Sequence, residues 1–158
     1  MKTLIVYYSF EGNTRYAARL LAEKLDAETL ELEPVKDYPR GKASKFVFGG
    51  AAASFSATPE LKPYVCQPEK YDLVILGSPV WASRVAPPMN TFLKSIDLRQ
   101  SRVAAFACCA GGSTERLFAA LEKQVGTLTE RASFLNPASH QEAAEKEAAR
   151  FAAALLHA

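Results

Sequence analysis

LIVYYSFEGNT, residues 4–14, is an apolar run followed by a turn of small and polar residues. The apolar run predicts a buried strand, and apolar residues at helical spacing begin directly after the turn. The first N–H groups of a helix have no partner inside the helix and carry a partial positive charge. Residues 9–14 are therefore predicted to bind an anion, and the rest of the chain indicates which one.

Length and composition limit the class of protein. A chain of 158 residues with 49% hydrophobic residues forms one domain, residues 1–158, and can bury a core without disulfides or metal. The formal charge of +2 provides no basic field, so we expect neither nucleic acid nor membrane as a partner. Lys2 is followed directly by the first strand and not by a signal-peptide core, which predicts a cytoplasmic protein.

The three cysteines, Cys66, Cys108 and Cys109, do not form a disulfide pattern, and no His or Cys stands at metal-ligand spacing beside them. Cys108 and Cys109 are neighbours on a predicted strand, so their side chains point to opposite faces, and a disulfide between adjacent residues is strained. We expect three reduced thiols and no metal site.

Strands and helices alternate along the chain. The predicted strands are residues 4–8, 27–33, 73–77, 103–109 and 127–135, and the predicted helices are residues 13–25, 87–96, about 115–125 and 141–156. The helix near 115 begins after Ser113 or Thr114, either of which can cap it. This alternation predicts an α/β fold: a single doubly wound five-stranded parallel sheet with helices on both faces. The strand order 2-1-3-4-5 is one that such sheets adopt.

Residues 34–70 are the least regular stretch, with five prolines and the pair Gly49-Gly50. The stretch is longer than an ordinary connection, so it contains a short helix over about 42–55, forms a cover, or does both. Three phenylalanines in it, Phe46, Phe48 and Phe55, belong either to the core beneath a loop or to a substrate pocket, and we favour the core.

Three turns that follow predicted strands carry unusual residues: SFEGNT at 9–14, SPVWASRVA at 78–86 and AGGST at 110–114. In a doubly wound sheet, ligands bind beyond the carboxyl ends of the strands, where the winding reverses direction. For this strand order the reversal lies between the first and third strands. Each turn alone is a weak signal, since such turns often only cap a helix, but their joint placement indicates a single binding site.

The order and spacing of these three turns resemble the short-chain flavodoxins and flavodoxin-like reductases, which bind FMN. The resemblance covers nearly the whole chain and implies the flavodoxin-like fold with FMN as cofactor. It implies that the cofactor-binding residues are Ser9, Phe10, Glu11, Gly12, Asn13, Thr14, Ser78, Pro79, Val80, Trp81, Ala82, Cys109, Ala110, Gly111 and Gly112.

The same resemblance gives each turn a role. Residues 9–14 would hold the FMN phosphate through backbone N–H groups and the hydroxyls of Ser9 and Thr14, and Gly12 would permit close approach. Trp81 would stack on the isoalloxazine ring, and residues 109–112 would close the opposite side. No side chain is expected to act as a catalytic acid or base, since the flavin supplies the redox chemistry.

The chain departs from the family pattern at two places. Glu11 stands where the family usually has Thr or Ser, so we expect its carboxylate to point to solvent or to serve the helix N-terminus. Ala82 stands where one-electron carriers commonly have Gly, and a neutral Ser83 beside Arg84 replaces an acidic residue. Ala at positive φ costs about 1 kcal/mol more than Gly. The departures at Ala82 and Ser83 favour two-electron chemistry, in which FMN accepts a hydride, at least as much as one-electron transfer.

The resemblance therefore implies an FMN-binding electron-transfer protein or oxidoreductase. Its partner would be a redox protein or a small-molecule acceptor, and NAD(P)H is a candidate donor. The alternative is a flavin-free module on the same fold that uses residues 9–14 for another phosphorylated ligand or for docking a partner. Protein that stays colourless and does not quench FMN fluorescence would select this alternative.

Overall fold

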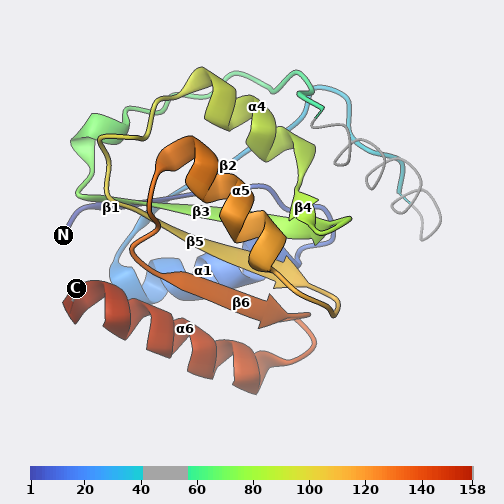
Figure 1. Ribbon diagram of the computed structural model, residues 1–158. Helices are drawn as coiled ribbons and strands as arrows, with labels where there is room; N and C mark the ends of the chain where they lie inside the picture. Colours follow the sequence, from blue (N-terminus) through green and yellow to red (C-terminus); the bar gives the residue numbers. More distant parts are fainter. Residues whose placement is uncertain (41–56, 158) are drawn as a thin grey trace.

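A computed structural model describes residues 1–40 and 57–157. Five parallel strands form the sheet in the order β2-β1-β3-β5-β6, which confirms the predicted order (Figure 1). Their bounds are β1 Thr3–Tyr7, β2 Glu28–Glu31, β3 Leu73–Trp81, β5 Val103–Cys109 and β6 Arg131–Leu135. A sixth strand, β4 Arg84–Val85, was not predicted; it pairs antiparallel with the end of β3.

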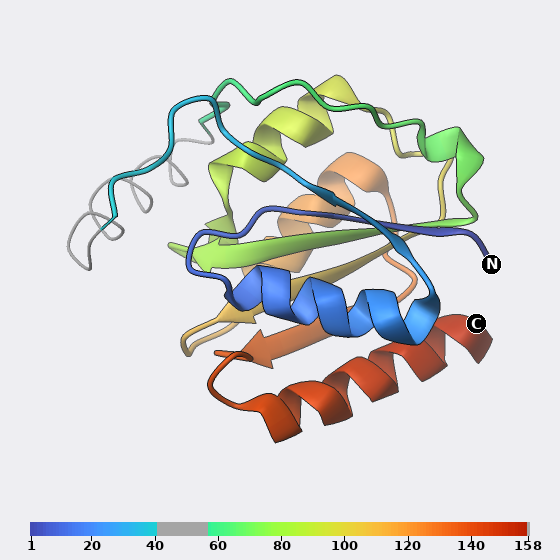
Figure 2. The same cartoon turned by 180° about the vertical axis from the view of Figure 1, so that it is seen from behind.

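Helices cover both faces of the sheet, as predicted. Helices α1 (Asn13–Leu25) and α6 (Gln141–His157) lie side by side on one face, and α4 (Pro87–Ser95) and α5 (Glu115–Val125) lie on the other (Figures 1 and 2). Each face has its own hydrophobic core. Neighbouring residues of one strand, such as Ile75 and Leu76, belong to opposite cores, which is why β3 is a continuous apolar run.

Residues 57–64 of the 34–70 stretch run beside helix α4 (Figure 2). Thr91 of α4 donates a hydrogen bond to the Pro59 carbonyl at 2.7 Å, and the Tyr64 ring lies 5.9 Å from that of Phe92. A short 3-10 helix, η2, spans Pro68–Lys70. This stretch therefore covers α4. The helix expected over about 42–55, with its three phenylalanines, lies outside the described residues.

Pro34 and Leu61 form an antiparallel bridge that closes residues 35–60 of this stretch into a loop. The Val35 N–H donates to the Glu60 carbonyl at 2.8 Å, and the Lys62 N–H donates to the Glu33 carbonyl at 2.7 Å. The Lys62 ammonium also lies 2.7 Å from the Glu33 carboxylate. Residues 35–60 thus leave and rejoin the rest of the molecule at one place. We call this bridge, with its flanking hydrogen bonds, the neck.

The described residues contain neither a membrane-spanning helix nor a cluster of metal ligands. None of their helices combines the length and apolarity that crossing a bilayer requires. Within residues 1–40 and 57–157, no three His, Cys, Asp or Glu side chains gather as a metal site would need. Cys66, Cys108 and Cys109 are unpaired thiols.

Candidate functional site

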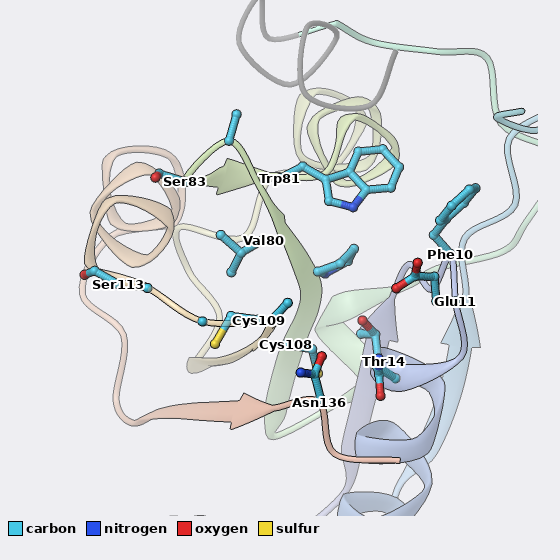
Figure 3. Close-up of a pocket in the computed structure, with 16 residues that line it drawn as sticks. Phe10, Glu11, Thr14, Val80, Trp81, Ser83, Cys108, Cys109, Ser113 and Asn136 are labelled. Atoms are coloured by element: carbon cyan, nitrogen blue, oxygen red, sulfur yellow. The ribbon is translucent and has the colours of Figure 1, made fainter. Parts of the chain in front are cut away.

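A cavity of about 250 Å³ opens at the carboxyl edge of the sheet, beyond the ends of β1, β3 and β5 (Figure 3). The three turns singled out from the sequence form its walls. Its lining residues are Phe10, Glu11, Asn13, Thr14, Pro79, Val80, Trp81, Ala82, Ser83, Cys108, Cys109, Ala110, Gly111, Gly112, Ser113 and Asn136.

The first wall is the turn between β1 and α1. Gly12 caps helix α1 at φ 100°, and a Cβ added there would meet no atom within 4 Å. The Ser9 hydroxyl accepts a hydrogen bond from the Arg15 N–H at 3.1 Å. Among the described residues, none accepts a hydrogen bond from the N–H groups of Asn13 and Thr14. This turn has the free donors and the open backbone that an anion site needs.

Glu11 lies on the same wall. It is exposed, but it also lines the cavity, and Figure 3 shows its carboxylate on the cavity side of the turn. We expected Glu11 to point to solvent or to serve the helix N-terminus; it is exposed, directly precedes the N-cap Gly12 and also lines the cavity. A carboxylate placed there opposes a bound anion by charge repulsion.

Thr14 and Cys108 join the first wall to the cavity floor. Thr14 is 1% exposed and lines the cavity together with Cys108. Burial raises the pKa of Cys108 to about 12, so this thiol is neutral near pH 7 and a poor nucleophile. The Asn13 side-chain oxygen accepts a hydrogen bond from the Ala138 N–H at 3.1 Å, which ties the start of α1 to the turn before α6.

The second wall is a hairpin where a loop was expected. Strand β3 runs on to Trp81, which pairs with Arg84, so only Ala82 and Ser83 form the turn. Both residues have positive φ, 49° and 62°, as a type I′ turn requires. Each non-glycine residue in this conformation costs about 1–2 kcal/mol.

The Ser78 hydroxyl braces the hairpin from inside. It donates to the Pro79 carbonyl and accepts from the Ala86 N–H, both at 2.9 Å. Ser78 is 2% exposed. It therefore supports the wall without lining the cavity.

Trp81 sits at the end of β3 with its indole largely enclosed. It is 5% exposed, and three rings meet it edge-to-face: Tyr38 at 5.2 Å, Phe10 at 5.5 Å and Tyr8 at 5.8 Å. These contacts fix the ring, and the part that they leave uncovered lines the cavity (Figure 3). Trp81 thus joins the hairpin to the first wall and to the segment before residue 41.

The third wall follows β5. Gly111 and Gly112 have φ 140° and 83°, and a Cβ at either position would meet no atom within 4 Å. Asn136, from the turn between β6 and α6, closes this side; its N–H donates to the Cys109 carbonyl at 2.9 Å. A ligand can approach the backbone of this wall closely because no side chain stands in the way.

Most of the predicted site residues line the cavity, and three do not. Ser9 and Ser78 hold the turns in shape through their hydroxyls, and Gly12 supplies the conformation that starts α1. Sequence reasoning missed four lining residues: Ser83, Cys108, Ser113 and Asn136. The signal for Asn136 was its place at the carboxyl end of the strand beside β5, a position where ligand-contacting residues gather.

A second cavity, of about 290 Å³, lies against the other side of the first wall. Ion pairs border it: Arg15 with Glu31 at 2.6 Å, Lys62 with Glu33 at 2.7 Å and Arg40 with Asp37 at 3.0 Å. The Tyr8 hydroxyl is buried and has no hydrogen-bond partner within the described residues, and burial raises the pKa of Tyr8 above its usual range. The basic side chains that line this cavity equal the acidic ones in number, so the cavity has no net formal charge.

Comparison with known proteins shows the family to which the chain belongs. The family model for flavodoxin matches residues 2–148. A flavoprotein from Lactobacillus acidophilus NCFM, solved in complex with FMN, superposes with a TM-score of 0.72 at 24% identity, covering 89% of this chain and 97% of that one. Flavodoxin 2 from Bacillus cereus has a TM-score of 0.61 at 23% identity and covers 99% of each chain. No curated protein sequence matches significantly. The chain belongs to the flavodoxin family.

Proposed function

We propose that this chain is an FMN-binding flavoprotein that transfers electrons as its flavin cycles between oxidised and reduced forms. The observation that carries the proposal is the convergence of three turns on one cavity, with a helix start ready for an anion at one end and Trp81 at the other. The solved relative that contains FMN has the same fold and supports this choice of ligand.

The cavity fits FMN in its chemistry. The N–H groups of Asn13 and Thr14 would hold the phosphate, because they are donors without acceptors among the described residues. Residues 79–82 and 110–112 would hold the ring between an aromatic wall and a glycine wall. At about 250 Å³ the cavity is smaller than the roughly 300–1,000 Å³ of pockets that enclose a ligand, so part of the flavin would stay exposed to a partner.

The flavin would supply the redox chemistry, and the residues of the chain would bind and orient it. Cys108 is a neutral thiol near pH 7 because burial raises its pKa to about 12, so it offers no thiolate to the ring. We assign no catalytic acid or base to the cavity. The chemistry depends instead on which donor and acceptor reach the exposed flavin edge.

We infer two-electron chemistry with a small-molecule acceptor and a reduced nicotinamide as donor. Arg84, next to the hairpin turn, is exposed and favours a reduced, anionic ring, and the near-neutral chain lacks the acidic charge that family electron carriers present to basic protein partners. A redox protein partner is the competing assignment. The three unpaired thiols fit a reducing compartment, the cytoplasm.

The test begins with titration of the apoprotein with FMN. We expect quenching of flavin fluorescence and a yellow complex after gel filtration. The complex is then mixed with NADH or NADPH in a stopped-flow spectrometer, where fast bleaching directly to the fully reduced spectrum is expected. Binding without bleaching would reject the nicotinamide donor, and absence of binding would reject the flavin itself.

A further inference from the structure

We propose that Arg40 is a positioning residue for the anion-binding turn, and that it sets the preference for a phosphorylated flavin over an unphosphorylated one. Arg40 lies outside the three turns, in the segment that follows β2. The inference rests on the proposed function, because it concerns the phosphate of the same ligand.

The Arg40 guanidinium binds the turn through the backbone. Its Nη1 donates a hydrogen bond to the Phe10 carbonyl oxygen at 3.2 Å. The guanidinium also lies over the Phe10 ring, 5.3 Å from the ring centroid, which is the distance of a cation–π contact. One side chain thus holds both the main chain and the side chain of Phe10.

Two further contacts fix the segment that carries Arg40. Asp37 accepts a hydrogen bond from Arg40 Nη2 at 3.0 Å, so the guanidinium is held from two sides. Tyr38, between them, packs its ring edge-to-face on Trp81 at 5.2 Å. Arg40 is exposed, and its hydrogen bonds to Phe10 and Asp37 together with the contact over the Phe10 ring set the orientation of its guanidinium.

The geometry of the peptide bond turns this contact into an effect on the ligand site. In a trans peptide the C=O and N–H point in opposite directions, and the described peptide bonds are all trans. Arg40 lines the second cavity, whereas Phe10 and Glu11 line the first. The Phe10 carbonyl and the Glu11 N–H belong to one peptide group. Holding this carbonyl toward Arg40 therefore turns the Glu11 N–H away from Arg40, toward the side where the phosphate would lie.

A preorganised donor improves binding because the ligand does not have to reorient the backbone. The contribution of Arg40 to binding should concern only the phosphate, since the isoalloxazine would lie against residues 79–82 and 110–112. Riboflavin lacks the phosphate, so the difference between FMN and riboflavin binding measures this contribution. A general loss of structure would weaken both ligands alike.

The experiment measures the dissociation constants of FMN and riboflavin for the full chain and for Arg40→Met, Arg40→Lys and Asp37→Asn. Arg99→Met is the matched control, because Arg99 is likewise exposed and paired with a nearby carboxylate, Asp97, at 2.7 Å. We expect Arg40→Met to weaken FMN about tenfold, the loss of one charged hydrogen bond, and to leave riboflavin unchanged. Arg40→Lys keeps one donor and recovers part of the loss, and Asp37→Asn gives a smaller loss.

The measurement is repeated in about 1 M NaCl, where the Debye length is about 3 Å and attraction through solvent is screened. A loss in Arg40→Met that persists in salt supports positioning, and a loss that disappears in salt means that Arg40 acts only by its charge and overturns the proposal. Equal weakening of both flavins, or no change in either, also overturns it. If the unmodified chain binds neither flavin, the proposed function fails and this inference fails with it.

Discussion

The first and second walls of the cavity both need residues at positive φ, and they differ in the residues that adopt it. The 9–14 turn needs one residue at positive φ and has Gly12 there, at φ 100°. The 81–84 hairpin turn needs two such residues and has Ala82 and Ser83. The first wall is relaxed, whereas the second stores about 1–2 kcal/mol at each of two positions. Strain that persists at a site is kept by the surrounding packing, here the rings around Trp81.

Removing the Trp81 ring would break the link between the two walls. Trp81→Ala should lower the free energy of unfolding by about 3–5 kcal/mol, because the buried indole contacts three other rings. Urea denaturation measures the change. Trp81→Phe, which keeps an aromatic ring, should lose much less. An alanine variant as stable as the parent would show that the hairpin is held by other contacts.

Placing a side chain in the relaxed wall would remove the difference between the walls. Gly12→Ala should lower the free energy of unfolding by about 1–2 kcal/mol and weaken FMN binding, because alanine at φ 100° is strained although the space for its Cβ is open. Thermal unfolding and FMN titration give the two effects. Unchanged stability would mean that the turn relaxes to negative φ.

Relieving the strained wall should have the opposite sign. Ala82→Gly should raise the free energy of unfolding by about 1 kcal/mol, since glycine adopts φ 49° without steric cost. Ala119→Gly in helix α5 is the control: Ala119 is exposed in a helix, so glycine there should destabilise by about 0.5–1 kcal/mol. If both variants were destabilised alike, residue 82 would not be strained.

Neutralising Glu11 tests the relaxed wall with the smallest expected effect. Glu11→Gln should tighten FMN about threefold by removing repulsion between the carboxylate and the phosphate, and should leave riboflavin unchanged. The ratio of the two dissociation constants at low salt is the measurement. An equal change for both flavins would place Glu11 beside the ring instead.

The sequence is most informative where local signals and tertiary packing agree. Helix α1 has the predicted bounds, 13–25, because the apolar stripe begins directly after Gly12. Strand β5 also has its predicted bounds, 103–109, since its residues are buried on both faces. The alternation of elements predicted a doubly wound sheet, and its strand order followed from the resemblance to the flavodoxins.

The hairpin could not be read from local sequence. Two-residue turns of this type are typically Asn-Gly or Asp-Gly, and Ala82-Ser83 contains neither signal. What forms the turn is long-range packing of Trp81 and the Ser78 hydroxyl on the Ala86 N–H. Asn136 was missed for a related reason: the β6–α6 turn looks like an ordinary helix start, and only folding brings it beside Cys109.

The neck at Pro34 and Leu61 makes this region suited to loop exchange. The bridge and the flanking hydrogen bonds hold the two ends together, and each doubling in length of a flexible loop costs only about 0.6 kcal/mol of closure entropy. A variant with a longer or shorter connection between Pro34 and Leu61 should therefore keep the sheet intact. Asp37, Tyr38 and Arg40 are the part of this connection that should be retained, since they touch the cavity walls.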